Sequence, residues 1–243
     1  MTSRLKMAAL LILALPVFCV AQRPLPFRGS FLMSFNEEGL GQKKAWPFQC
    51  TTDISKTGLE IKDDMNKKGV LKRILYNEVD STWLMLIGYN KVKQATLIHA
   101  RAMFSNKMKS PVVITKPTGE KKVISGYTCM KYITVSENDS AVVWASQDLQ
   151  FDLGRLYKML SHCGMMSSYV DEGTWFYSRK IKGMVLEVTS FTKKTGAFYT
   201  MNISDIRLGE INETYFNISG YRISNIPEGE NCGPAAKLKD EKK

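Results

Sequence analysis

A hairpin that leads into a helix-like segment, at residues 123–149, constrains the fold of this 243-residue chain most. Two runs rich in β-branched and aromatic residues, Gly126–Val135 and Ala141–Ser146, flank the polar turn Glu137–Ser140. This pattern predicts two antiparallel strands joined by a short turn. The second run leads into Gln147–Leu160, where leucines recur at the spacing of one helical face. These leucines are Leu149, Leu153, Leu156 and Leu160.

We therefore expect a helix over Gln147–Leu160. Ser146 can cap its first turn with the side-chain hydroxyl, and Asp148 lies where the helix dipole favours a negative charge. Gly164 can end the helix in a left-handed conformation. The simplest interpretation of the leucine stripe is packing against a sheet.

The rest of the chain predicts short strands separated by turns, typical of an antiparallel, mainly β protein. Thr82–Tyr89 is apolar at successive positions, which indicates a strand covered on both faces. Lys116–Glu120 contains Pro and Gly and predicts a hairpin loop. The other expected strands are Phe27–Asn36, Trp46–Asp53, Thr57–Asp63, Val70–Asn77, Gln94–Phe104, Val112–Thr115, Lys121–Ile124, Trp175–Lys180, Met184–Thr192 and Ala197–Ile206.

The N-terminus predicts a signal peptide over residues 1–21. Two basic residues, Arg4 and Lys6, precede the apolar run Met7–Val20. The run is shorter than the ~20 residues that span a bilayer as a helix. An uncleaved membrane anchor and a lipid-modified Cys19 are the alternatives. We expect an exported protein, periplasmic or secreted.

The remaining 222 residues suit one domain, expected over 22–229, with a flexible charged tail at 230–243. The net charge of +11 would favour nucleic acid in a cytoplasmic protein. Behind a signal peptide we expect no nucleic acid, and an anionic envelope component is the more natural partner. Because the lysines are spread over many turns, a plainly solvated surface is the other interpretation.

Four cysteines follow the leader: Cys50, Cys129, Cys163 and Cys232. An exported compartment permits disulfides, and four cysteines allow three full pairings. Cys129–Cys163 is the first candidate, and buried free thiols are the alternative. The wide spacings fit no zinc signature, so we expect no metal and no cofactor.

No catalytic motif is present, and we expect a binding protein rather than an enzyme. His162 and Cys163 are neighbours at the end of the expected helix, where their side chains would point in different directions. Four N-x-S/T triplets would carry glycans in a eukaryotic secreted protein and carry no such meaning in a bacterial one. They begin at Asn138, Asn202, Asn212 and Asn217.

The central stretch also carries an ordered motif. It consists of a Gly-Tyr-x-Cys-x-x-Tyr strand, a polar turn, a Val-Trp-Ala-Ser strand and an Asp-Leu pair. These positions are Gly126, Tyr127, Cys129, Tyr132, Val143–Ser146, Asp148 and Leu149. The motif resembles the exported Bacteroidota proteins grouped as domain of unknown function 4412. Thr118–Glu120 and the signal peptide also look like that family.

The resemblance implies a fold like that of the periplasmic lipoprotein carriers (LolA/LolB-like). That fold is a curved antiparallel sheet, an open half-barrel, with one main helix over the concave face. Known carriers of this shape hold acyl chains in the concavity. The family has no established activity, so the resemblance implies no catalytic residues.

Two functions from different classes follow. The first is a monomeric periplasmic carrier for a lipid or other apolar ligand; the plain alternative for its candidate residues is core packing. These residues are Trp83, Met85, Ile87, Val142, Trp144, Leu153, Met184 and Leu186. The second is an envelope scaffold that binds an anionic partner through a basic surface. Lysines on the convex face of the sheet would favour the second.

Overall fold

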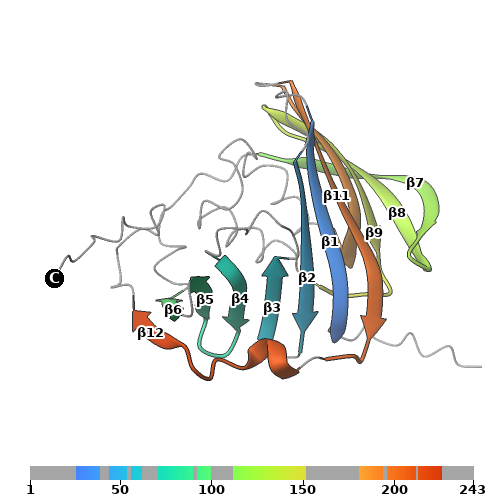
Figure 1. Cartoon of the computed structure of the whole chain (residues 1–243). Coiled ribbons are helices and arrows are strands. Elements are labelled where there is room, and N and C mark those ends of the chain that lie inside the picture. Colours follow the sequence, from blue (N-terminus) through green and yellow to red (C-terminus); the bar gives the residue numbers. More distant parts are fainter. Residues whose placement is uncertain are drawn as a thin grey trace, which may run out of the picture.

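Twelve strands form one open sheet in the part of the chain that the computed structural model describes (Figure 1). The described residues are 26–38, 44–53, 56–61, 71–89, 92–99, 112–151, 181–193, 196–211 and 213–225. The sheet is visibly curved, and its strand order is β12-β6-β5-β4-β3-β2-β1-β11-β10-β9-β8-β7. The mainly β class and the open antiparallel sheet predicted from the sequence are confirmed.

Most strand bounds follow the expected runs, with β7 and β12 as the exceptions. They are β1 Gly29–Glu38, β2 Lys44–Thr52, β3 Lys56–Ile61, β4 Leu71–Asn77, β5 Thr82–Tyr89, β6 Val92–His99, β7 Ile114–Ile124, β8 Tyr127–Val135, β9 Asp139–Ser146, β10 Met184–Thr192, β11 Ala197–Leu208 and β12 Arg222–Asn225. A short 3₁₀ turn, η3, covers Glu213–Phe216. Neighbours are antiparallel except for β12, which runs parallel to β6.

Strand β1 joins two meanders. On one side it pairs with β2, and on the other with β11, which lies more than 150 residues later in the chain. Phe35 is thus opposite Trp46 on one side and Met201 on the other. The meanders β2–β6 and β7–β11 become one sheet through this strand.

One face of the sheet carries the main core, and we call it the inner face. Along β1, Phe31, Met33 and Phe35 are buried, whereas the intervening residues are half-buried. The same alternation runs along β11, where Met201 and Ile203 are fully buried. This period of two is what a sheet with one apolar face requires.

The opposite, outer face of β3–β6 has a smaller core. Leu75, Leu86 and Ala95 are buried there against the half-buried Phe216 and Tyr221. Trp83 and Leu86, on the two sides of β5, are both buried, which confirms a strand covered on both faces. No local pattern in the sequence predicts η3 and β12, because pairing with β6 and contacts with the outer face of β3–β6 hold them in place.

One of those contacts is an arginine that satisfies carbonyl groups of the crossing segment. The Arg73 guanidinium donates to the carbonyl oxygens of Thr214 and Tyr215 at 2.9 and 2.8 Å. The Tyr215 hydroxyl contacts the Glu60 carboxylate. The segment is thereby fixed over β3 and β4 and can reach β6 as strand β12.

The prediction of a hairpin loop at Lys116–Glu120 is wrong. β7 is one continuous strand, and residues 118–120 form a bulge between the pairs Pro117–Tyr132 and Lys121–Met130. The real turn lies at Ser125 and Gly126, both with positive φ (51° and 85°). Two successive residues with positive φ match the twist of a two-residue hairpin turn. The residue pair that tolerates this backbone marks the turn, and the Pro/Gly cluster does not.

The expected helix does not begin at Gln147. Residues 147–151 leave the sheet without helical structure, and Gln150 forms a parallel bridge with Pro26. The Phe27 amide donates to the Gln150 carbonyl at 2.8 Å, and the Asp148 amide donates to the Ser146 hydroxyl at 3.3 Å. The first bond takes a carbonyl that a helix through this segment would use for its own ladder. The second bond is of the kind that a helix N-cap makes. Residues 152–160, with Leu153, lie outside the described residues.

Residues 147–151 nevertheless cross toward the inner face, as expected of the segment after β9. Leu149 is buried in the main core, and Phe151 packs edge-on against Phe27 and Phe31, with ring centroids 6.0 and 5.3 Å away. Since β9 and β1 are separated by β10 and β11 in the sheet, this segment spans the ends of those two strands. The expected strand Trp175–Lys180 lies outside the described residues. No helix among the described residues has the length and apolarity to cross a membrane.

Gly183, just before β10, gives a sharp test of this crossing. Its φ is +98°, and a Cβ there would lie 1.9 Å from the carbonyl oxygen of Ser146. We expect Gly183→Ala to lower the free energy of unfolding by about 3 kcal/mol, because the backbone must move. Denaturant unfolding followed by tryptophan fluorescence measures it.

Gly196 is the matched control. Its φ is +70°, yet nothing lies within 4 Å of the added Cβ. Gly196→Ala should cost about 1 kcal/mol, the intrinsic penalty of a left-handed residue. Equal losses in the two variants would contradict a close approach at Gly183.

Candidate functional site

The inner face of β4 and β5 carries an aromatic pair at its centre. The rings of Tyr76 and Trp83 are stacked, with centroids 3.9 Å apart and planes inclined by 28°. Trp83 is 1% exposed, and its indole Nε1 has no hydrogen-bond partner in the described part of the chain. A buried N–H without an acceptor is uncommon and costs about 1–3 kcal/mol.

Accessible apolar side chains lie beside this pair. Met85 and Ile87 alternate with Leu84 and Leu86 along β5, so they share the face of Trp83. Both are half-buried and pack against the main core. By contrast, Met184 and Leu186 at the start of β10 are fully buried.

The structure therefore divides the eight candidate ligand residues. Trp83, Met85 and Ile87 lie together on the inner face. Met184 and Leu186 lie in the fully closed part of the main core, next to a bulge between Val185 and Glu187. Leu153 is outside the described residues.

Val142 and Trp144 lie on the other face. The inner positions of β9 belong to Ala141, Val143 and Ala145, which are all buried. The described sheet therefore does not bring Val142 and Trp144 together with Trp83, Met85 and Ile87. The reason is the register of β9. Ala141 points to the inner face, so the alternation along the strand puts Val142 and Trp144 on the outer face.

Trp144 instead lies among charged side chains on the outer face. The Lys122 ammonium lies 4.4 Å from the centroid of its ring, and that of Lys131 lies 5.8 Å away. Lys122 also pairs with Glu187 at 2.6 Å. The ring is thus covered by cations, and contacts of this kind are worth ~0.5–2 kcal/mol each.

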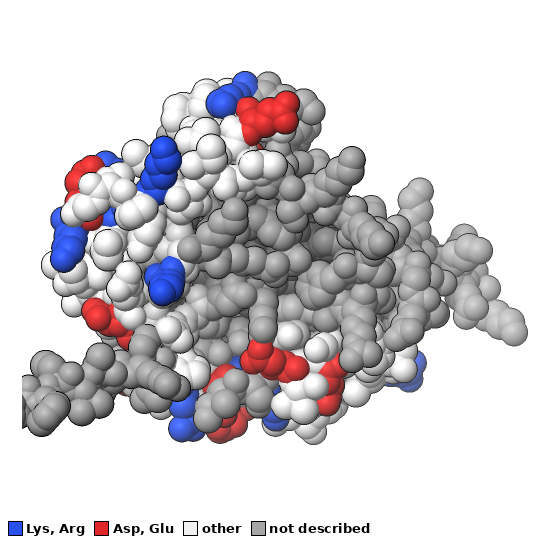
Figure 2. All heavy atoms as spheres, turned by 180° about the vertical axis from the view of Figure 1, so that it is seen from behind, with Lys and Arg blue, Asp and Glu red and all other residues white. Residues whose placement is uncertain are grey.

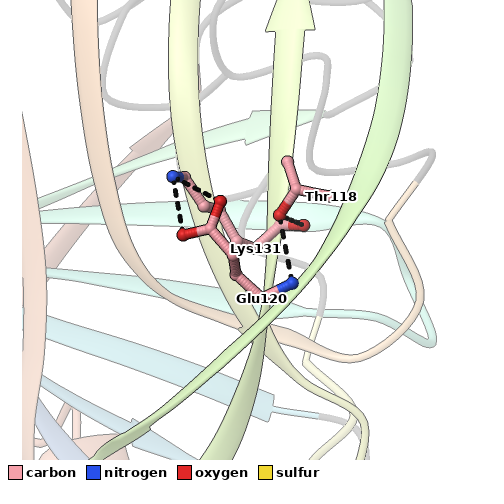
Figure 3. A network of polar contacts seen from close by, with 3 residues as sticks. All are labelled: Thr118, Glu120 and Lys131. Atoms are coloured by element: carbon pink, nitrogen blue, oxygen red, sulfur yellow. Dashed lines mark hydrogen bonds and ion pairs between the residues drawn. The ribbon is translucent and has the colours of Figure 1, made fainter.

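The β7 bulge supplies the counter-charge for the second lysine (Figure 3). Lys131 Nζ lies 2.9 and 3.0 Å from the two carboxylate oxygens of Glu120. The Glu120 amide donates to the Thr118 hydroxyl at 3.2 Å, which fixes the bulge. Bulges often re-aim a side chain in this way, here a carboxylate toward β8.

Apolar side chains continue from this cluster across the outer face. Cross-strand pairing places one row over five strands: Ile114, Val135, Ser140, Phe191 and Phe198. The next row holds Lys116, Ile133, Val142, Thr189 and Thr200. Directly paired residues share a face, so the two rows form one surface. We call these rows with Trp144 the outer patch.

Described charges do not form a single-sign field. In the view of Figure 2, lysine and arginine side chains lie interspersed with carboxylates, and wide neutral areas separate them. The lysines in register with the outer patch are Lys116 and Lys131, so part of the basic charge falls on this face.

A polar cleft lies beside Ser30 near the start of β1 and beside Asp205 and Arg207 near the end of β11. It has a volume of about 770 Å³. Its lining residues are Ser30, Thr51, Asp205, Arg207, Gly209, Glu210, Ile211, Glu213 and Tyr215. Arg207 pairs with Asp205 at 3.1 Å and with Glu210 at 3.6 Å. The hydrogen bonds and charge of Asp205 raise the pKa of Arg207, so this cation balances part of the negative charge of the two carboxylates.

The described cysteines are buried thiols. Cys50 and Cys129 are both free in the structure and 0% exposed. Cys163, the expected partner of Cys129, lies outside the described residues, as does Cys232. Burial raises the pKa of both described thiols, so each stays protonated at neutral pH. Among the described residues, no group of three or more His, Cys, Asp and Glu is arranged to hold a metal.

Comparisons with known proteins give only distant likenesses. No protein-family model matches the chain, and no curated protein does. PNGF-II is 16% identical with a TM-score of 0.44; the match covers 81% of this chain and 31% of PNGF-II. An uncharacterised conserved protein from Thermus thermophilus is 6% identical with a TM-score of 0.43, covering 82% and 91% of the two chains.

A third similar structure is an outer membrane lipoprotein-sorting protein domain from Vibrio parahaemolyticus. It is 11% identical with a TM-score of 0.33, covering 78% of this chain and 89% of that one. Likenesses this distant assign no family and carry no functional argument. Membership in the domain of unknown function 4412 stays a prediction.

The buried thiol of Cys50 should make stability fall at high pH. Its pKa is raised above the ~8.5 of an unfolded thiol, so only the unfolded chain ionises as the pH rises past that value. The free energy of unfolding should then drop by up to about 1.4 kcal/mol per pH unit above pH 8.5. Cys50→Ala should remove this contribution, measured by denaturant unfolding between pH 8 and 10.5.

Val188→Ala is the control, because it truncates a buried side chain of β10 that does not titrate. Its stability should fall with pH in parallel with that of the wild-type chain. A Cys50→Ala slope equal to the wild-type slope would contradict a protonated thiol in the fold.

Proposed function

We propose that this chain is an exported, non-catalytic binding protein that holds an apolar, lipid-like ligand on the inner face of its curved sheet. The observation that carries the proposal is Trp83, whose buried indole N–H has no partner on an otherwise apolar surface of the described sheet. It is a donor placed among residues that an acyl chain would contact.

The gradient of burial along the inner face supports a site at β4 and β5. Most large apolar side chains of β1, β10 and β11 on the described inner face are closed off from solvent, as at Phe31, Met184 and Met201. Tyr76, Met85 and Ile87 remain half-buried. Ligand pockets combine such apolar walls with few polar groups, so this half of the face fits a ligand better than the closed half does.

The unpaired donor also indicates the kind of ligand. An acyl chain would lie against Met85 and Ile87, and a carboxylate or ester oxygen would accept the hydrogen of Trp83 Nε1. Such a bond would remove a desolvation penalty of about 1–3 kcal/mol. We therefore propose a long-chain carboxylate or ester, with the exported compartment and the resemblance to lipoprotein carriers as the wider setting.

Native mass spectrometry of the chain purified without detergent tests the proposal. We expect a co-purified amphiphile, or a complex after incubation with a long-chain fatty acid. Ile87→Trp should reduce fatty-acid binding at least tenfold, because the larger ring fills space on the inner face. Leu84→Trp, on the outer face of the same strand, is the control and should bind normally.

Trp83→Phe tests the polar contact separately, since it removes the N–H and keeps an aromatic ring on Tyr76. It should weaken fatty-acid binding about fivefold, the worth of one hydrogen bond, and leave the binding of a plain hydrocarbon unchanged. A wild-type chain that binds neither probe would refute the proposal. Equal effects of Ile87→Trp and Leu84→Trp would move the site elsewhere.

A further inference from the structure

From the outer patch we infer that this chain docks on an anionic lipid bilayer, with β7–β11 facing the headgroups. This inference concerns the opposite face from the ligand site and does not rest on it. Its residues are Ile114, Ile133, Val135, Val142, Trp144, Phe191 and Phe198, flanked by lysines of β7 and β8.

Exposed large apolar side chains concentrate on this face. The exposed fractions of Ile114, Phe198, Ile133 and Val135 are 57%, 49%, 42% and 40%. The pairing places all four in the two adjacent rows, and the Phe191 and Phe198 rings are 4.9 Å apart. Single exposed apolar residues are ordinary, but a contiguous group of them marks a surface that is covered in use.

The lysines of the flanking strands indicate the charge of the surface that would bind the outer patch. β7 and β8 carry Lys116, Lys121, Lys122 and Lys131. Their ion pairs in the described chain are Lys122–Glu187 and Lys131–Glu120. Lys121 pairs with Met130 and so faces the other side of the sheet, which leaves the Lys116 charge in excess on this face. The complementary surface is therefore anionic.

Shape and side-chain type favour a bilayer over a folded partner. The rows lie on the open face of a sheet, and none of their residues lines the described cleft. Lysines can reach the headgroup level while their aliphatic stems cover apolar surface. Trp144, beside the ammonium groups of Lys122 and Lys131, has the amphipathic ring that favours a membrane–water interface.

Vesicle flotation with the full-length chain tests the docking. We expect binding to vesicles of phosphatidylcholine with phosphatidylglycerol, and much weaker binding to phosphatidylcholine alone. Because Met7–Val20 is itself apolar, the readout is the difference between variants that share this segment. High salt should weaken the binding, since surface charges are screened.

The double variant Ile133→Ser, Phe198→Ser should reduce binding to anionic vesicles at least tenfold, because it removes the apolar contact. Val79→Ser is the control: Val79 is 78% exposed at the turn between β4 and β5, outside the outer patch. Equal binding of the double variant and the wild-type chain would overturn the inference, and so would an equal loss in Val79→Ser.

The excess charge is tested by Lys116→Gln, against Lys56→Gln in β3 as the control. A lysine near an anionic surface contributes about fivefold in affinity, so Lys116→Gln should weaken binding about fivefold. No binding of the wild-type chain to anionic vesicles would overturn the inference. So would a dimer in solution that Ile133→Ser, Phe198→Ser dissociates, because the outer patch would then belong to a second copy.

Discussion

The fold depends on the double pairing of β1. This strand takes one partner from the next stretch of chain and the other from the far end of the second meander. Its buried residues Phe31, Met33 and Phe35 form the middle of the main core. Without β1, the strands β2–β6 and β7–β11 would be two separate sheets with two additional exposed edges. Pairing over this sequence distance makes the sheet slow to complete in folding, because loop closure precedes the contacts that stabilise it.

The two faces that β1 helps to define have different chemistry. The inner face is almost wholly apolar, with polar side chains such as Thr134 and Ser190 at its margins. The outer face of β7–β11 carries exposed apolar side chains beside lysines, as at Ile133, Phe198 and Lys116. A single sheet can therefore present an apolar-ligand surface on one side and an interface for an anionic surface on the other. The two proposed activities would not compete for the same residues.

Strand positions could be predicted well from the sequence, since apolar alternation is a local signal. Thr82–Tyr89 and Met184–Thr192 coincide with β5 and β10. The segment after β9 could not, because the bond from Phe27 to Gln150 depends on a residue more than 100 positions away. The faces on which the candidate ligand residues lie could be predicted only in part, for a related reason. Trp83 was found as a large apolar residue on the correct face, but the face of Trp144 follows from register. The acidic partner of Lys131 was beyond reach, because only the bulge aims Glu120 toward it.

The β7 bulge affects how readily the open sheet can aggregate through its edges. A sheet that does not close leaves two rows of unpaired backbone groups, on which other chains can add and polymerise. At β7 this edge is interrupted by Pro117, which lacks an amide hydrogen, and by the bulge, with Lys116 and Lys121 on either side. At the other edge, β12 offers only four residues, all exposed. These two edges therefore disfavour the addition of further copies of the chain and the growth of fibrils.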